Sequence, residues 1–115
     1  MKKIIYTLVF MVISSNVYAG FAAGLDVWRI RVHTSNVVLF GSQTQPANTC
    51  NNWGEYFIFD QTTDAGKSLL STLLTAKASG KLVTVWYADS PTAGTDHTNG
   101  CTNNTTAIVT GIAFN

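Results

Sequence analysis

Residues 55–87 constrain the fold most, because they have the pattern of a strand, one capped helix and a second strand. Thr62 or Thr63 supplies a hydroxyl that caps the first helical turn, and Gly80 stands where a left-handed residue ends a helix. Between these ends, apolar residues recur at spacings of three and four, which is typical of a helix with one buried face. They are Ala65, Leu69, Leu70, Leu73, Leu74 and Ala76. No other segment has a helical pattern, so the sequence predicts a mainly β chain with one helix.

Short runs rich in β-branched and aromatic residues surround this helix and predict five strands. The runs are residues 25–33, 37–40, 56–60, 82–89 and 107–114. Alternation within the runs leads us to expect Trp28, Phe57, Phe59 and Trp86 in the core. The order strand, strand, strand, helix, strand, strand is that of the OB-fold, a five-stranded, partly open Greek-key barrel. A flat sheet with one helix packed across it is the alternative architecture.

The first nineteen residues have the pattern of an export signal. Lys2 and Lys3 precede an apolar run over residues 4–12, and Val17-Tyr18-Ala19 places small residues where a signal peptidase reads them. The apolar run is too short to span a membrane. We therefore expect a signal peptide over residues 1–19, a single domain over residues 20–115 with no membrane span, and an exported protein, either periplasmic or secreted.

Charge and composition argue against two classes of function. Lys2 and Lys3 are two of the seven basic residues, so the expected mature chain has five basic and six acidic residues and a net charge of −1. Nucleic acids bind through neutralisation of many phosphates, which this composition does not favour. No spacing of acids, histidines and nucleophiles matches a catalytic arrangement, and we expect neither an enzyme nor a cofactor nor a metal site. Asp96-His97 lies in a Gly- and Thr-rich loop and is interpreted as solvated surface.

Cys50 and Cys101 are the only cysteines, and an exported chain meets an oxidising compartment. We expect a disulfide between them that closes a loop of about fifty residues and contributes on the order of 4 kcal/mol by the chain-entropy model. A redox or metal-binding thiol pair is the competing interpretation, but the spacing is not C-x-x-C and no further ligands lie nearby. The bridge would join two long polar loops, residues 42–54 and 90–105.

Trp53 differs from the other aromatic residues because it lies in a polar loop, CNNWGEY, rather than in a strand. Aromatic faces stack on the C–H surfaces of sugars, while amides, hydroxyls and carboxylates bind the ring hydroxyls. Trp53 with Asn51, Asn52 and Glu55 is therefore a candidate glycan-binding set. The alternative is that Trp53 covers the open end of the barrel beside the disulfide.

The layout of nearly the whole expected mature chain resembles the B subunits of pertussis-like AB5 toxins, especially that of subtilase cytotoxin. The resemblance lies in VWRIRVHTS, a cysteine loop before YFIFD, LLSTLLTAKASGK, VTVWY, a second cysteine and AIVTGIAF. It implies an OB-fold, a homopentameric ring, binding of host-surface glycans that are typically sialylated, and central helices lining a pore where an enzymatic A subunit docks. The other hypothesis is a stand-alone exported OB-like domain with a structural or protein-interaction role.

The disulfide gives a direct test. Non-reducing mass spectrometry of the exported chain should give a mass about 2 Da below that of the form with two free thiols, because the bridge removes two hydrogens. Reduction and alkylation should then label both cysteines. Labelling without prior reduction would mean that the two loops are not joined.

Overall fold

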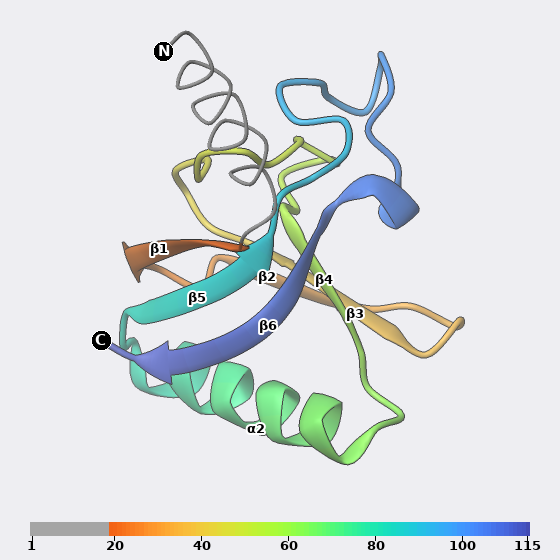
Figure 1. Cartoon of the computed structure of the whole chain (residues 1–115). Coiled ribbons are helices and arrows are strands. Elements are labelled where there is room, and N and C mark those ends of the chain that lie inside the picture. The colour runs from red at the N-terminus through yellow and green to blue at the C-terminus, as the bar shows by residue number, and fades with distance from the viewer. Residues whose placement is uncertain (1–18) are drawn as a thin grey trace, which may run out of the picture.

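Residues 19–115 are described by a computed structural model, in which a six-stranded mixed sheet packs against one α-helix (Figure 1). The elements are β1 (Ala19–Leu25), β2 (Arg29–Val32), β3 (Val37–Gly41), β4 (Phe57–Asp60), α2 (Asp64–Ser79), β5 (Val83–Ala88), the short 3-10 helix η3 (Asn103–Thr105) and β6 (Ala107–Phe114). The predicted export signal lies outside the described residues except for its last residue, Ala19, where β1 begins. The prediction of a mainly β domain with one helix is confirmed for the described part of the chain.

The strands are ordered β1-β5-β6-β4-β3-β2, with β4 and β6 parallel and every other neighbouring pair antiparallel. The expected five-stranded, partly open barrel differs from the observed sheet in two respects. A sixth strand, β1, precedes the expected five, and the two edge strands, β1 and β2, are not paired with each other, so the sheet is not closed into a barrel. The sequence of β1, AGFAAGL, consists mainly of glycine and alanine, which have weak β-propensity. Its pairing with β5, rather than local preference, makes it a strand.

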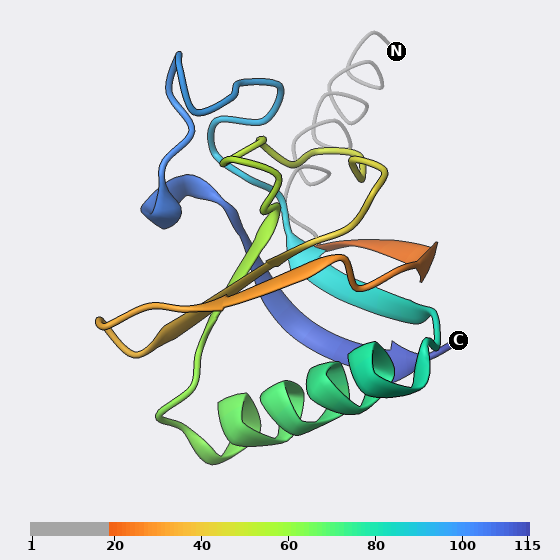
Figure 2. The same ribbon diagram turned by 180° about the vertical axis from the view of Figure 1, so that it is seen from behind.

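The connection between the two edge strands bends the sheet. Only residues 26–28 separate Leu25 at the end of β1 from Arg29 at the start of β2. Four Cα-to-Cα steps span at most about 14 Å, so the two edges approach each other at this point, as the direct passage of the chain from β1 into β2 makes visible (Figure 2). Trp28 fixes the bend, because its N–H donates to the carbonyl of Gly41 at 2.9 Å and its own carbonyl accepts from Lys77 at 2.9 Å.

The inner face of the curved sheet carries the core. Its largest fully buried side chains include Phe40, Phe57, Leu73 and Tyr87. Burial of Phe57 and Phe59 confirms two of the four aromatic predictions. The other two were wrong, since Trp28 and Trp86 are 45% and 41% exposed. Trp28 lies in the break between strands, where alternation stops, and Trp86 lies between Val85 and Tyr87, which take the inner face.

Local signals for the helix are confirmed at both ends. The side chain of Thr63 accepts from the N–H of Gly66 at 2.9 Å, and Gly80 ends the helix with a left-handed φ of 69°. Gly66 is required by packing, because a Cβ atom there would lie 1.8 Å from the carbonyl oxygen of Asp60. The buried stripe is narrower than predicted: Leu73 is fully buried, whereas Leu74 is 49% exposed.

The predicted disulfide is present between Cys50 and Cys101, whose Cα atoms lie 5.7 Å apart. It joins the loop after β3 to the loop before η3, and it is consistent with an oxidising, extracytoplasmic location. Within residues 19–115, α2 is neither long nor apolar enough to cross a bilayer, and no other helix there meets that requirement.

Leu73 and Leu74 offer a matched test of the helix orientation. Leu73→Ala should lower the free energy of unfolding by roughly 2–5 kcal/mol, because it removes a fully buried side chain. Leu74→Ala, one residue away at a half-exposed position, should change it by less than about 0.5 kcal/mol. Urea denaturation followed by circular dichroism measures both. Equal effects would contradict the assigned buried face.

Candidate functional site

The predicted glycan-binding residues lie together in one tight hairpin at the loop end of the sheet. Asn52 and Glu55 exchange two backbone hydrogen bonds of 3.1 and 3.0 Å. The two residues between them, Trp53 and Gly54, have φ values of 59° and 87°, which is the pattern of a type I′ turn. The side-chain oxygen of Asn51 accepts from the N–H of Gly54 at 2.7 Å and tightens the turn.

Trp53 occupies a backbone position that favours asparagine or glycine. A bulky residue with positive φ is strained, and such strain is retained mainly where surrounding structure imposes it. The side chain of Trp53 is 64% exposed, and one of its faces stacks on His97, with ring centroids 3.7 Å apart and an interplanar angle of 24°. The stack joins the hairpin to the loop that ends at Cys101. An aromatic platform therefore projects from the turn into solvent.

Glu55 lies beneath this turn and is fully buried. Arg31 binds its carboxylate with two nitrogens, Nη2 at 2.8 Å from Oε1 and Nε at 2.9 Å from Oε2, while Nε of Arg29 lies 3.3 Å from Oε2. The hydrogen bonds to Glu55 raise the pKa of Arg31 above its ordinary value, so its charge is retained. One carboxylate beside two guanidinium groups leaves a surplus positive charge. The partly exposed Arg29 carries it and also donates to the carbonyl of Trp53 at 3.2 Å.

Asn52 is also engaged inside the protein. Its side-chain amide donates to the side-chain oxygen of Asn103 at 2.7 Å, and the same oxygen accepts from Arg31 at 3.0 Å. Asn52 is only 4% exposed. The structure thus brings all four predicted residues together, but it exposes mainly Trp53, while the side chains of Asn52 and Glu55 hold the hairpin against η3 and β2.

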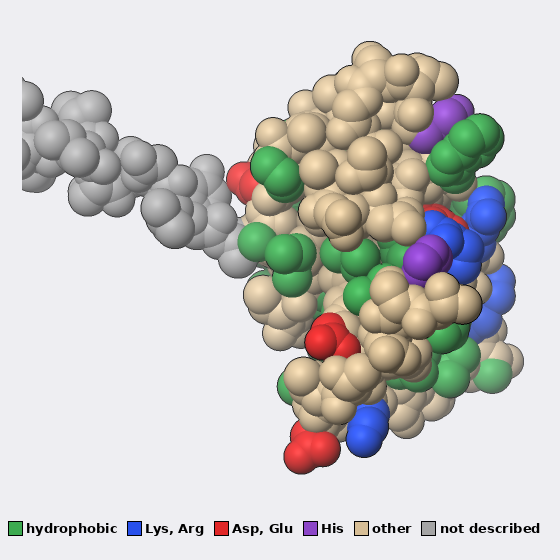
Figure 3. All heavy atoms as spheres, turned by 90° about the vertical axis from the view of Figure 1, so that its right-hand side faces the viewer, with side chains coloured by type: hydrophobic (Ala, Val, Ile, Leu, Met, Phe, Trp, Pro, Cys, Tyr) green, Lys and Arg blue, Asp and Glu red, His purple; other side chains and the backbone are tan. Residues whose placement is uncertain are grey.

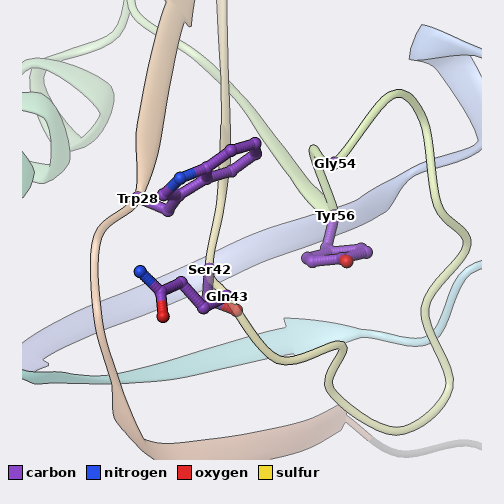
Figure 4. Close-up of a pocket in the computed structure, with 5 residues that line it drawn as sticks. All are labelled: Trp28, Ser42, Gln43, Gly54 and Tyr56. Atoms are coloured by element: carbon purple, nitrogen blue, oxygen red, sulfur yellow. The ribbon is translucent and has the colours of Figure 1, made fainter.

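A pocket of about 300 Å³ lies against the same hairpin (Figure 4). Its lining residues come from three segments and are Trp28, Ser42, Gln43, Gly54 and Tyr56. Two glycines permit this close packing. A Cβ atom on Gly54 would lie 2.7 Å from the indole ring of Trp28, and one on Gly41 would lie 1.8 Å from the carbonyl oxygen of Gly54. The indole ring therefore packs over the backbone of the turn and forms one side of the pocket.

Two polar groups in the pocket are free to bind a ligand. The side-chain amide of Gln43 has no hydrogen-bond partner among residues 19–115, while its backbone N–H is held by Asp26 at 3.0 Å. The hydroxyl of Tyr56 also has no protein partner there, and since no fully enclosed side-chain polar atom lacks one, that hydroxyl reaches solvent. Burial raises the pKa of Tyr56, so the phenol remains protonated and able to donate at neutral pH.

The hydroxyl of Ser42 is already engaged, because it donates to the carbonyl of Thr44. Sequence reasoning missed the pocket as a whole. Trp28 was assigned to the core, and Gln43 and Tyr56 carry no recognisable motif. Only the fold brings these residues to one place.

Three other titratable side chains, Asp96, His97 and His33, make local contacts. The carboxylate of Asp96 accepts from the hydroxyl and the N–H of Thr98, and these bonds lower the pKa of Asp96 below its usual range. His97 is occupied by the stack on Trp53, and Nδ1 of His33 lies 2.8 Å from the hydroxyl of Ser35. Within residues 19–115 no three His, Cys, Asp or Glu side chains are grouped so as to hold a metal ion.

One face of the molecule combines arginine and lysine, histidine and hydrophobic side chains within a small area (Figure 3). Such a mixture suits a ligand with both apolar and polar surfaces.

Comparison with known proteins adds no assignment: no family model, curated protein or solved structure matches this chain.

Glu55→Gln tests whether the buried ion pair supports the hairpin. The change leaves the guanidinium of Arg31 without its anionic partner and should lower the free energy of unfolding by roughly 2–4 kcal/mol. Asp89→Asn, which removes an exposed carboxylate with no ion pair in the described structure, should change it by less than about 0.5 kcal/mol. Thermal and urea unfolding at neutral pH measure both variants. A Glu55→Gln protein as stable as the wild type would show that the hairpin does not depend on this carboxylate.

Proposed function

We propose that this chain is a non-catalytic, glycan-binding subunit of an exported, ring-forming assembly of the AB5 B-subunit type, located in the periplasm or secreted. The observation that carries the proposal is the pocket in which the indole of Trp28, the free amide of Gln43 and the protonated phenol of Tyr56 converge. An aromatic face with a few directed hydrogen-bonding groups is the chemistry that recognises a sugar ring.

The size of the pocket limits how much of a glycan enters it. A volume of about 300 Å³ is at the lower end for small-molecule sites and suits a single sugar residue. The rest of a glycan would extend over the hairpin, where the exposed ring of Trp53 offers a second stacking surface. In this proposal Asn51, Asn52 and Glu55 contribute by holding the turn. The surplus positive charge at Arg29 supports the sialylated ligands that the family resemblance implies, because a sialic acid carries a carboxylate.

The strand arrangement supports the OB-like part of the proposal. The five strands expected from the sequence occur in the order β5-β6-β4-β3-β2, and β1 continues into β2 after three residues. β1 and β2 can therefore be treated as one first strand, broken at residues 26–28, whose two halves pair with β5 and β3, the two ends of the remaining four strands. In a closed barrel the two edge strands would pair with each other. Here the broken strand connects the two edges through the chain instead.

The helix is the part of the chain that the resemblance assigns to assembly. Its exposed side carries Ser71, Thr75 and Ser79, and the hydroxyls of Thr75 and Ser79 donate to carbonyls of the preceding turn. These side chains are uncharged, polar and exposed to solvent, and such a surface would suit the water-filled pore of a homopentamer. An enzymatic A subunit would dock at that pore.

The pocket can be tested with a glycan array on the mature protein, followed by calorimetry with the best-bound monovalent oligosaccharide. Trp28→Ala should weaken binding about tenfold, because it removes the stacking surface, which is worth roughly 1.4 kcal/mol. Trp86→Ala removes an equally exposed tryptophan from another face and should leave the affinity per site unchanged. Calorimetry with a monovalent ligand keeps this comparison independent of avidity.

Failure of the wild-type protein to bind any glycan would overturn the proposal and favour the stand-alone exported domain. Binding that survives Trp28→Ala but is lost on Trp53→Asn would show that the sugar binds on the exposed ring of Trp53 rather than in the pocket. Asparagine suits the left-handed backbone at position 53, so that variant should fold well.

A further inference from the structure

Three large apolar side chains lie exposed on the outer face of β1, β5 and β6. Phe21 pairs directly with Trp86 across β1 and β5, so both side chains project from the same face. Ile108 pairs with Ala88, which is two residues beyond Trp86 and therefore on that face as well. The exposed fractions of Phe21, Trp86 and Ile108 are 64%, 41% and 56%. We refer to this surface as the β1–β5–β6 face.

The indole ring of Trp86, at the centre of this face, packs against the neighbouring strand β6. Trp86 is paired with Gly111 on β6, and a Cβ atom on Gly111 would lie 3.4 Å from the Cε3 atom of the indole ring. Glycine at this position leaves room for the ring above the neighbouring strand. The result is a broad apolar surface rather than a single protruding side chain.

The composition of these strands is unusual for a surface that faces water. None of the 7, 6 and 8 residues of β1, β5 and β6 is charged. In addition, β1 is an edge strand with neither a charged residue nor a proline, the devices that commonly prevent such strands from associating. Depletion of charge together with enrichment in aromatic residues is the composition of the core of a protein–protein interface.

The area of the face agrees with that role. Phe21, Trp86 and Ile108 together expose on the order of 300 Å² of apolar surface, since one aromatic side chain carries about 150–250 Å². A stable interface buries about 800 Å² on each partner, of which only the centre is predominantly apolar. The face therefore has the size of an interface centre, with Thr84, Thr110 and the adjoining loops left to form the rim.

We propose that the β1–β5–β6 face binds the same face of a second copy of this chain. An uncharged apolar surface can pack against a copy of itself, because the contact brings no like charges together. A contact between two identical faces is isologous. The inference goes beyond the proposed function, because an isologous contact joins two chains, whereas a ring of five is built by heterologous contacts elsewhere on the chain. It does not depend on the glycan pocket, whose lining residues belong to other segments of the chain.

Analytical ultracentrifugation of the mature protein over a micromolar concentration range tests this contact. The wild type should self-associate, and the double variant Phe21→Lys/Ile108→Lys should raise the dissociation constant at least about a hundredfold, because each contact would have to bury unpaired charges. Val32→Lys introduces one positive charge at a position that is 56% exposed on β2 and should leave association unchanged. Circular dichroism and thermal unfolding establish that each variant is folded.

Three results would overturn the inference: a monomeric wild type across that range, an oligomer unaffected by the double lysine variant, or equal dissociation by Val32→Lys. A monomer that binds an unrelated protein through this face would overturn it as well. Glycan affinity per site, measured by calorimetry on the same variants, separates the two proposals. A monomer that still binds glycan refutes the association and the ring but not the pocket, and an oligomer that binds none refutes only the pocket.

Discussion

The short connection between the two edge strands is the constraint on which the rest of the structure depends. Because only residues 26–28 join β1 to β2, the edges of the sheet cannot move apart, and the sheet must curl around its inner face. The curl gives Phe40, Phe57 and Tyr87 a common interior. It also places Trp28, the last residue of the connection, against the hairpin that contains Gly54. Closing the core and building one side of the pocket are therefore consequences of the same bend.

The hairpin shows how stability and a binding surface are combined in a small domain. A buried carboxylate is costly unless it is paired, and Glu55 is paired with two arginines from β2. This ion pair, the amide of Asn52 and the disulfide fix a turn in which Trp53 adopts a strained, left-handed backbone. The strain is tolerated because the surroundings are rigid. An exposed aromatic ring held in this way requires little further ordering when it meets a ligand.

Two separate apolar regions of the described surface differ in their chemistry. Trp28 and Trp53 lie at the hairpin beside hydrogen-bonding groups and the charge of Arg29, which favours a polar ligand such as a glycan. Phe21, Trp86 and Ile108 lie on strands without any charged residue, which favours another protein surface. This difference in chemistry is the reason for assigning a ligand to one region and a second copy of the chain to the other. Bivalent binding follows if both assignments hold, since association of two copies would bring two pockets together.

The sequence by itself determined the parts of the protein that depend on local preferences. Spacing, propensity and composition predicted the helix with its C-cap at Gly80, the burial of Phe57 and Phe59, and the pairing of the two cysteines. They left the N-cap open between Thr62 and Thr63. Trp53 was also recognised, because a tryptophan in a polar loop stands out without any structure. Tertiary structure decided what depends on distant segments. It made a strand of the glycine- and alanine-rich β1, brought Trp28, Gln43 and Tyr56 to one pocket, and buried Glu55 between arginines that lie 24 and 26 positions earlier in the chain. These outcomes arise from pairing and packing energies between segments, which no local pattern encodes.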